Sequence, residues 1–206
     1  MTRIANFIDG GYLEKSLRGY CIDHNVLALI MTGDHDLLRT YYYDCLPYQS
    51  CPPTDYDIRR IDAKRRFISA LERLPRFTVR LGQLEIRGED GREVQKRVDT
   101  LLALDLYDLS VKHQITDAAI LAGDSDLLPA IERAKAEGVV IHLFHGPSVH
   151  RDMLRCCDEH TPITAEFVQS LLYAQQQKRR PAGLLHVQQR AEGSHRHCGV
   201  QAEPVP

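Results

Sequence analysis

Two short apolar segments that each lead to an aspartate constrain the fold of this chain most strongly. Residues 3–9 form an apolar run that ends at Asp9, and residues 118–122 form a second run that precedes Asp124 and Asp126. The second run is continuously apolar rather than alternating, which is typical of a strand buried on both faces of a parallel sheet. Such strands end at the edge of the sheet where open α/β folds place their active sites.

Strand and helix patterns alternate along residues 3–145, which predicts a three-layer α/β domain with a mainly parallel central sheet. The dipeptide Asp90-Gly91 suits a tight turn and predicts a hairpin over residues 85–95. We expect strands at residues 3–9, 37–45, 77–84, 118–122 and 139–144, and helices at residues 11–18, 22–31, 55–74, 94–112, 126–137, 148–157 and 164–177.

The composition is that of an ordinary globular domain, and it sets limits on location and partners. The net charge is −2, so any nucleic acid must be bound by a local basic patch rather than by overall charge. We recognise no signal peptide and no apolar stretch near the roughly 20 residues that span a bilayer, so we expect a cytoplasmic protein without membrane contact. We expect one domain over residues 1–173 and a disordered tail over residues 174–206.

The six cysteines form no CxxC pair and no compact framework, which favours reduced thiols. His142, His145 and His150 surround the end of the expected strand at residues 139–144, and we interpret them as structural or exposed. The alternative is a zinc site that combines these histidines with cysteines, but the spacing does not match a standard finger. The cysteines considered for it are Cys45, Cys51, Cys156 and Cys157.

Four aspartates are expected near the carboxyl edge of the sheet. Asp9, Asp124 and Asp126 follow strands, and Asp99 lies at the start of the helix that precedes the strand at residues 118–122. Converging carboxylates repel one another unless a cation neutralises them, and Mg²⁺ prefers such oxygen ligands. Each acid also has a simpler interpretation: a turn at Asp9, a helix cap at Asp124, and a favourable first-turn acid at Asp99.

Three motifs resemble the NYN domain family, which includes the bacterial LabA-like proteins and belongs to the PIN-like nuclease group. The likeness extends from about residue 2 to about residue 170, and the third motif is the most specific. The motifs are Phe7-Ile8-Asp9-Gly10-Gly11, then Lys96-Arg97-Val98-Asp99 with Asp105 further on, then Ala119-Ile120-Leu121-Ala122-Gly123-Asp124-Ser125-Asp126-Leu127.

The resemblance implies a PIN-like, Rossmann-like fold and a ribonuclease with Mg²⁺ or Mn²⁺ among its acids. The implied catalytic and metal-binding residues are Asp9, Asp99, Asp124 and Asp126. The resemblance also implies that Lys96 lies at the rim of the site and contacts a backbone phosphate of the RNA. It implies that Ser125 lies near the waters of the metal ion or helps to cap the next helix. Tyr12 stands where many members have Asn, and it could stack on a base. From the residues themselves, Arg92, Lys96 and Arg97 are the first candidates for phosphate contacts.

Two other classes compete with the nuclease. A phosphatase of the haloacid dehalogenase type needs a second acid two residues after its nucleophile, and that position is Gly11. A non-catalytic RNA- or protein-binding regulatory domain would have the same fold and a basic rim. The presence of all four acids favours the nuclease. A homodimer and a regulatory protein partner both stay open.

Overall fold

The computed structural model describes residues 2–87 and 92–179. Its seven-stranded sheet has the order β4-β3-β2-β1-β5-β6-β7, in which every neighbouring pair is parallel except β3 and β4. The predicted α/β class with a mainly parallel sheet is confirmed. The strands are β1 (Arg3–Asp9), β2 (Asp36–Cys45), β3 (Phe77–Arg87), β4 (Arg92–Lys96), β5 (Asp117–Leu121), β6 (Val140–His145) and β7 (Glu159–Pro162).

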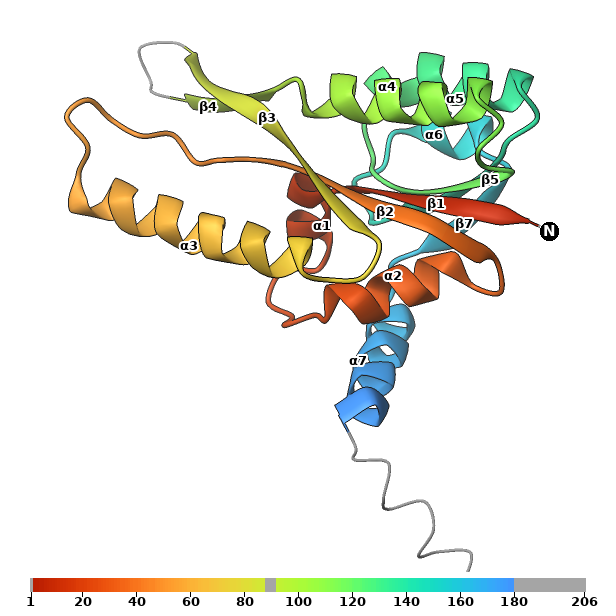
Figure 1. Ribbon diagram of the computed structural model, residues 1–206, viewed down its shortest axis with the longest axis horizontal. Helices are drawn as coiled ribbons and strands as arrows, with labels where there is room; N and C mark the ends of the chain where they lie inside the picture. The colour runs from red at the N-terminus through yellow and green to blue at the C-terminus, as the bar shows by residue number, and fades with distance from the viewer. Residues whose placement is uncertain (1, 88–91, 180–206) are drawn as a thin grey trace, which may run out of the picture.

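Helices cover both faces of the sheet and make the three layers visible in Figure 1. The layer of α4, α5 and α6 lies on one face, and α1, α2, α3 and α7 lie on the other. The described helices are α1 (Gly10–Ser16), α2 (His24–Thr32), α3 (Asp55–Glu72), α4 (Val98–Val111), α5 (Leu128–Ala136), α6 (Arg151–Cys156) and α7 (Ala165–Arg179), with a 3-10 turn η1 (Ser125–Leu127) before α5.

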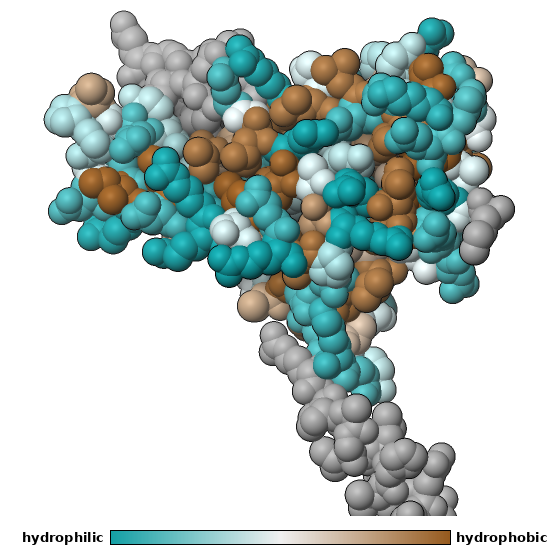
Figure 2. All heavy atoms as spheres, viewed as in Figure 1, coloured by the Kyte–Doolittle hydropathy of each residue, from teal (hydrophilic) through white to brown (hydrophobic). Residues whose placement is uncertain are grey.

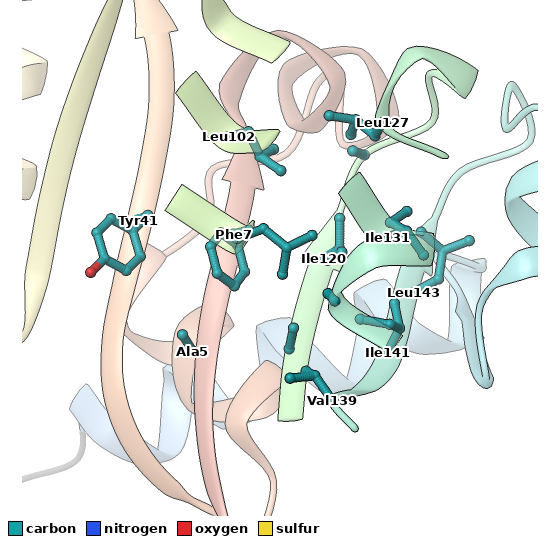
Figure 3. Packing of buried hydrophobic residues seen from close by; sticks show 14 of the residues in the cluster. Ala5, Phe7, Tyr41, Leu102, Ile120, Leu127, Ile131, Val139, Ile141 and Leu143 are labelled. Atoms are coloured by element: carbon teal, nitrogen blue, oxygen red, sulfur yellow. The ribbon is translucent and has the colours of Figure 1, made fainter. Parts of the chain in front are cut away.

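Alternate residues of β1 divide between the two cores, because successive strand side chains point to opposite faces. Phe7 is fully buried beneath α4 and α5, where it stacks on Tyr41 of the neighbouring strand (Figure 3). Ile8 is fully buried on the other face, in the cluster that includes residues of α1 and α2. The central position of β1 follows from this two-sided burial.

The strand order reverses direction beside β1, and this determines where a site can form. The chain runs outward from β1 to β2, β3 and β4 and then returns to place β5 on the other side of β1. Phe7 pairs with Ile120 and Ile8 pairs with Leu121, so the two strands end side by side. In open α/β sheets, this switch point at the carboxyl ends is where ligands bind.

The expected helix at residues 94–112 was wrong at its start. Residues 92–96 form β4, and α4 begins only at Val98. Between them, Arg97 has a φ of 72°, a left-handed conformation that neither a strand nor a helix can continue through. The apolar residues Val94 and Val98 have helical spacing, which explains the error. The hairpin is confirmed in its strands, and its turn at residues 88–91 lies outside the described residues.

Two further segments differ from expectation. β7 was not predicted, because Glu159–Pro162 has no apolar pattern. The last helix runs to Arg179, so the expected start of the tail at residue 174 was wrong. Residues 180–206 lie outside the described residues, and for them the tail remains a prediction. In the described part of the chain no helix has the length and apolar character needed to cross a bilayer.

Candidate active site

Asp9 is the last residue of β1 and Asp124 follows the end of the paired strand β5, and both serve as caps. The Tyr12 backbone N–H donates to Asp9 Oδ1 at 3.1 Å and thereby caps α1. The Asp126 N–H donates to Asp124 Oδ1 at 3.1 Å and caps η1. The capping interpretation is therefore correct for Asp124, although it caps a 3-10 turn rather than an α-helix. These bonds also fix both carboxylates at the carboxyl edge of the sheet.

The four predicted acids are linked by electrostatic repulsion, which acts through Asp99. Burial, together with the charge of Asp99, raises the pKa of Asp9 from 3.8 to about 6, against the opposing bond from the Tyr12 N–H. Burial raises the pKa of Asp99 as well, and the charges of Asp124 and Asp126 add to this effect. Asp99 is half-buried in the first turn of α4, which packs against η1.

This charge is suited to a hard divalent cation, because desolvated carboxylates with raised pKa values gain from a positive partner. The acids are gathered at one edge but not closed into a tight ligand set. Among the described residues, no three of them have oxygens that all lie within 4.8 Å of one another. Mg²⁺ keeps several waters and needs few carboxylates, so it fits such an open arrangement better than a metal that demands a complete protein cage.

A cleft of about 480 Å³ opens beside Asp9 and Asp124. The positively charged side chain of Lys15 in α1 lines this cleft, and none of the sequence motifs pointed to it. His150 also lines the cleft, and its backbone N–H donates to the Gly123 carbonyl at 3.0 Å. The complete lining is Asp9, Gly11, Tyr12, Lys15, Gly123, Asp124, Ser125, Ser148, Val149 and His150.

Tyr12 forms a fixed wall of this cleft. A Cβ atom built on Gly123 would lie 2.2 Å from Cε2 of the Tyr12 ring, so the ring lies directly on the Gly123 backbone. The Tyr12 hydroxyl accepts from the Gly146 N–H at 3.0 Å. Only glycine at position 123 allows this close approach.

The other predicted substrate-binding residues have different placements. Ser125 lines the cleft. Arg97 is exposed and lies two residues before Asp99. The side chains of Arg92 and Lys96 lie outside the described residues, although their backbones form the two ends of β4. Contact of any of these residues with phosphate stays a prediction.

Asp44 is a fifth carboxylate near the site that sequence reasoning missed. It lies near the end of β2, it is 2% exposed, and its Oδ2 is 2.5 Å from Lys64 Nζ. Its charge contributes to the raised pKa of Asp9. The sequence feature that could have identified Asp44 is its position near the end of β2, the strand adjacent to β1.

Asp105, by contrast, is engaged elsewhere. Its Oδ2 accepts from the Tyr43 hydroxyl at 2.9 Å and from Arg80 Nε at 3.1 Å. Both partners belong to strands that lie under α4, and this arrangement indicates a structural role for Asp105.

Basic residues also gather on and directly after α3. Arg59, Arg65, Arg66 and Arg73 are exposed, and hydrophilic residues predominate along the visible side of α3 in Figure 2. Lys64 is instead held by Asp44, and Arg60 lies over the Tyr56 ring. These exposed residues form a solvated basic face.

The fold and the position of its acids define a PIN-like α/β domain. A model of the NYN domain matches residues 3–164, and the chain therefore belongs to the NYN domain family. This membership places it among PIN-like nuclease domains, whose substrates are nucleic acids. The resemblance inferred from the three motifs is confirmed.

Other comparisons add little. No curated protein matches the chain. One solved structure, described as a candidate oxidoreductase from Parabacteroides merdae ATCC 43184, is similar over 86% of this chain and 30% of its own, with 10% identity and a TM-score of 0.30. The chain thus spans less than a third of that protein, and a similarity this weak carries no functional argument.

Proposed function

We propose that the chain is a metal-dependent ribonuclease that hydrolyses phosphodiester bonds of RNA at the carboxyl edge of its sheet. The observation that carries the proposal is the position of Asp9 and Asp124 in one cleft at the carboxyl edge of the sheet. The charge of Asp99 raises the pKa of Asp9, and the charges of Asp124 and Asp126 raise the pKa of Asp99. Family membership supplies the nuclease class. The preference for RNA over DNA follows the family likeness.

Asp9 and Asp124 are the proposed direct ligands of Mg²⁺ or Mn²⁺, because they end the two strands at the switch point. Asp99 and Asp126 complete the shell through oxygen or water. The ion supplies charge stabilisation on the scissile phosphate and lowers the pKa of a coordinated water.

The chain's own groups hold the substrate in this proposal. The Lys15 ammonium offers a positive charge to a phosphate that enters the cleft, and the Ser125 hydroxyl offers a donor beside Asp124. The Tyr12 ring is restrained by Gly123 and Gly146, so it forms a rigid surface against which a base can lie. Arg92, Lys96 and Arg97 are the further phosphate contacts of this proposal.

The test is cleavage of a labelled single-stranded RNA by the full chain, with Mg²⁺, with Mn²⁺ and with EDTA. Asp9→Asn and Asp124→Asn should each lower the cleavage rate at least about 100-fold, because each removes a charge that holds the ion. Asn retains an oxygen that can accept the capping bond, so both variants should remain folded by circular dichroism.

Asp105→Asn is the matched control, since it neutralises an acid on the same helix as Asp99 that binds Tyr43 and Arg80 instead. It should cleave at close to the wild-type rate. Cleavage by Asp124→Asn at the wild-type rate would refute the site assignment.

The second candidate is a non-catalytic RNA- or protein-binding domain, and the capping bonds favour it, since they give Asp9 and Asp124 a structural purpose without a metal. A folded wild type that binds this RNA in a gel shift but cleaves it under none of the metal conditions would select that function.

A further inference from the structure

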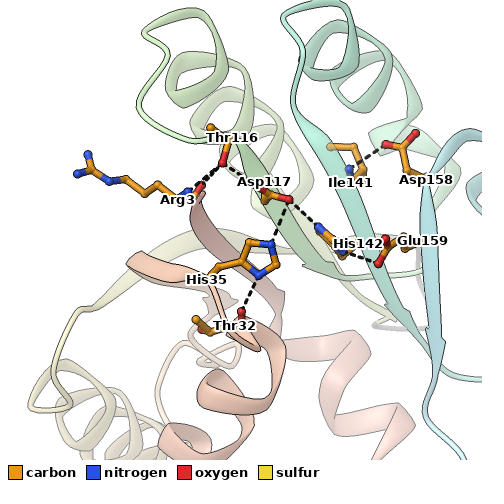
Figure 4. Close-up of polar contacts among 9 residues, drawn as sticks. All are labelled: Arg3, Thr32, His35, Thr116, Asp117, Ile141, His142, Asp158 and Glu159. Carbon is orange, nitrogen blue, oxygen red and sulfur yellow. Dashed lines mark hydrogen bonds and ion pairs between the residues drawn. The ribbon is translucent and has the colours of Figure 1, made fainter. Parts of the chain in front are cut away.

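A second cluster of ligating side chains lies toward the amino ends of the parallel strands, whereas the acids lie at their carboxyl ends. His35, Asp117 and His142 each offer one ligand atom, and these atoms all lie within 4.8 Å of one another. Asp117 begins β5, the strand whose other end leads to Asp124. Figure 4 shows both imidazole rings directed at the Asp117 carboxylate.

The cluster joins three parts of the chain. His35 lies in the connection between α2 and β2, Asp117 begins β5, and His142 is the third residue of β6. The Nε2 atoms of His35 and His142 lie 3.4 and 2.9 Å from the same Asp117 oxygen, Oδ1. Asp117 is 5% exposed, whereas both histidines are partly exposed, so the site is sheltered but open to an ion from solvent.

Both rings are oriented from behind by oxygen acceptors. His35 Nδ1 lies 3.1 Å from the Thr32 carbonyl oxygen, and His142 Nδ1 lies 3.0 Å from Glu159 Oε2. In the tautomer with the proton on Nδ1, each ring donates to these oxygens and directs its Nε2 lone pair toward Asp117. Histidines that bind metal through one nitrogen characteristically donate from the other to a carbonyl or carboxylate.

The hydrogen-bond count is compatible with a metal ion between the three ligands. Four ring nitrogens face a carbonyl or carboxylate oxygen, and a neutral imidazole has only one N–H, so two neutral rings satisfy two of the four contacts. A metal ion shared by the two Nε2 atoms and Asp117 would satisfy the other two in place of a second proton on each ring.

The distances agree with this arrangement. Ligand bonds of about 2.0–2.2 Å in a tetrahedral zinc site put neighbouring ligand atoms about 3.3–3.6 Å apart. The 3.4 Å contact of His35 is already in this range, and the 2.9 Å contact of His142 needs a small outward movement. We propose that His35, Asp117 and His142 form a binding site for Zn²⁺ that clamps the amino edge of the sheet.

The ligand chemistry separates this site from the acid cluster. Two imidazole nitrogens and one carboxylate favour zinc and its neighbours among the transition metals, whereas the acid cluster offers oxygens alone, which suit Mg²⁺. Three protein ligands leave the fourth position to water. The proposal is independent of the proposed nuclease function.

The experiment uses the tag-free full chain, stripped with a chelator and held in excess Mg²⁺ so that the acid cluster is supplied. Zn²⁺ is titrated against a competing chelator, and bound zinc is counted by elemental analysis. His35→Gln and His142→Gln should each lower zinc affinity about 100-fold or more and remove one ion per chain. Co²⁺ should give the intense visible absorption of tetrahedral coordination in the wild type but not in His35→Gln or His142→Gln.

His160→Gln is the matched control, because this exposed histidine of β7 lies outside the cluster, and it should bind zinc like the wild type. Asp124→Asn should also keep its zinc, which distinguishes failure of this site from failure of the nuclease proposal. Zinc bound outside the cluster is common to all variants, so the difference between variants decides.

His35 lies in a connecting segment, and circular dichroism of the metal-free His35→Gln variant checks that it folds. Equal zinc content and affinity in the wild type and in a folded His35→Gln variant would overturn the proposal. Absence of bound zinc in the wild type would overturn it too.

Discussion

The Tyr12 hydroxyl and the Gly146 backbone N–H form a 3.0 Å hydrogen bond that joins α1 to the segment after β6. The Tyr12 ring also lies on the backbone of Gly123, two residues after the end of β5. One side chain therefore holds three segments in register around the cleft, and its surroundings can be tested by substitution.

Gly123→Ala should destabilise the fold by about 2 kcal/mol, because its new Cβ would collide with the Tyr12 ring. Urea denaturation measures the loss. Tyr12→Ala in the same chain should relieve the collision, so the double variant should lose less than the sum of the single losses. Tyr12→Phe keeps the ring, and in that background Gly123→Ala should cost as much as in the wild type. Additive losses in the Tyr12→Ala background would contradict the contact.

Asp9→Asn should stabilise the metal-free protein at neutral pH. The folded-state pKa of Asp9 is raised to about 6 from 3.8, so ionisation opposes folding, and stability is lost as pH rises from 3.8 through 6. At pH 7.5 in EDTA the variant should be more stable by up to about 3 kcal/mol, and the difference should vanish near pH 4. Thermal unfolding across this range checks the prediction. A gain that is the same at both pH values would show that ionisation of the buried Asp9 is not its cause.

Asp105→Ala should lower stability by about 2 kcal/mol, because it leaves the fully buried Tyr43 without its hydroxyl acceptor. Tyr43→Phe removes the donor, so Asp105→Ala should cost measurably less in that background. Denaturant titration of the four proteins supplies the comparison. An equal cost in both backgrounds would rule out the hydrogen bond as the source.

Lys64→Met should destabilise the protein by about 2–3 kcal/mol, since it leaves the buried Asp44 carboxylate without its cation. Asp44→Asn in that background should recover most of the loss. Lys112→Met is the control: Lys112 and Asp108 form a pair on α4 in which both side chains are more than half exposed, and its loss should cost less than about 0.5 kcal/mol. Chemical denaturation distinguishes them, and equal losses would contradict the buried-pair assignment.

The sheet was largely predictable, because its central strands are short apolar runs that end at turn residues or acids. The boundary between β4 and α4 was not predictable from periodicity, since it depends on the left-handed backbone of Arg97. β7 was missed because Glu159–Pro162 is a polar edge strand whose position depends on pairing with β6. Such pairing is a tertiary effect that overrides local propensity.

The edge of the sheet that carries Asp9 and Asp124 could be predicted from strand ends alone. Lys15 could not, because its position near these acids depends on how α1 packs beside β1. Asp44 was missed although it lies near the end of β2, the strand adjacent to β1. The contact of His35 and His142 with Asp117 was equally hidden, since it joins the segment between α2 and β2 to β5 and β6, which are far apart in the sequence. His142 was interpreted as structural or exposed, and the zinc alternative combined it with cysteines rather than with His35 and Asp117.

The outermost strand β7 has a consequence for how copies of this chain can associate. An edge strand presents unpaired backbone groups that invite another chain to add a strand. β7 is only four residues long, it carries the exposed Glu159 and His160, and it ends in Pro162, which has no N–H to donate. This edge is therefore a poor template for sheet extension, and any homodimer should form through a different surface of the molecule.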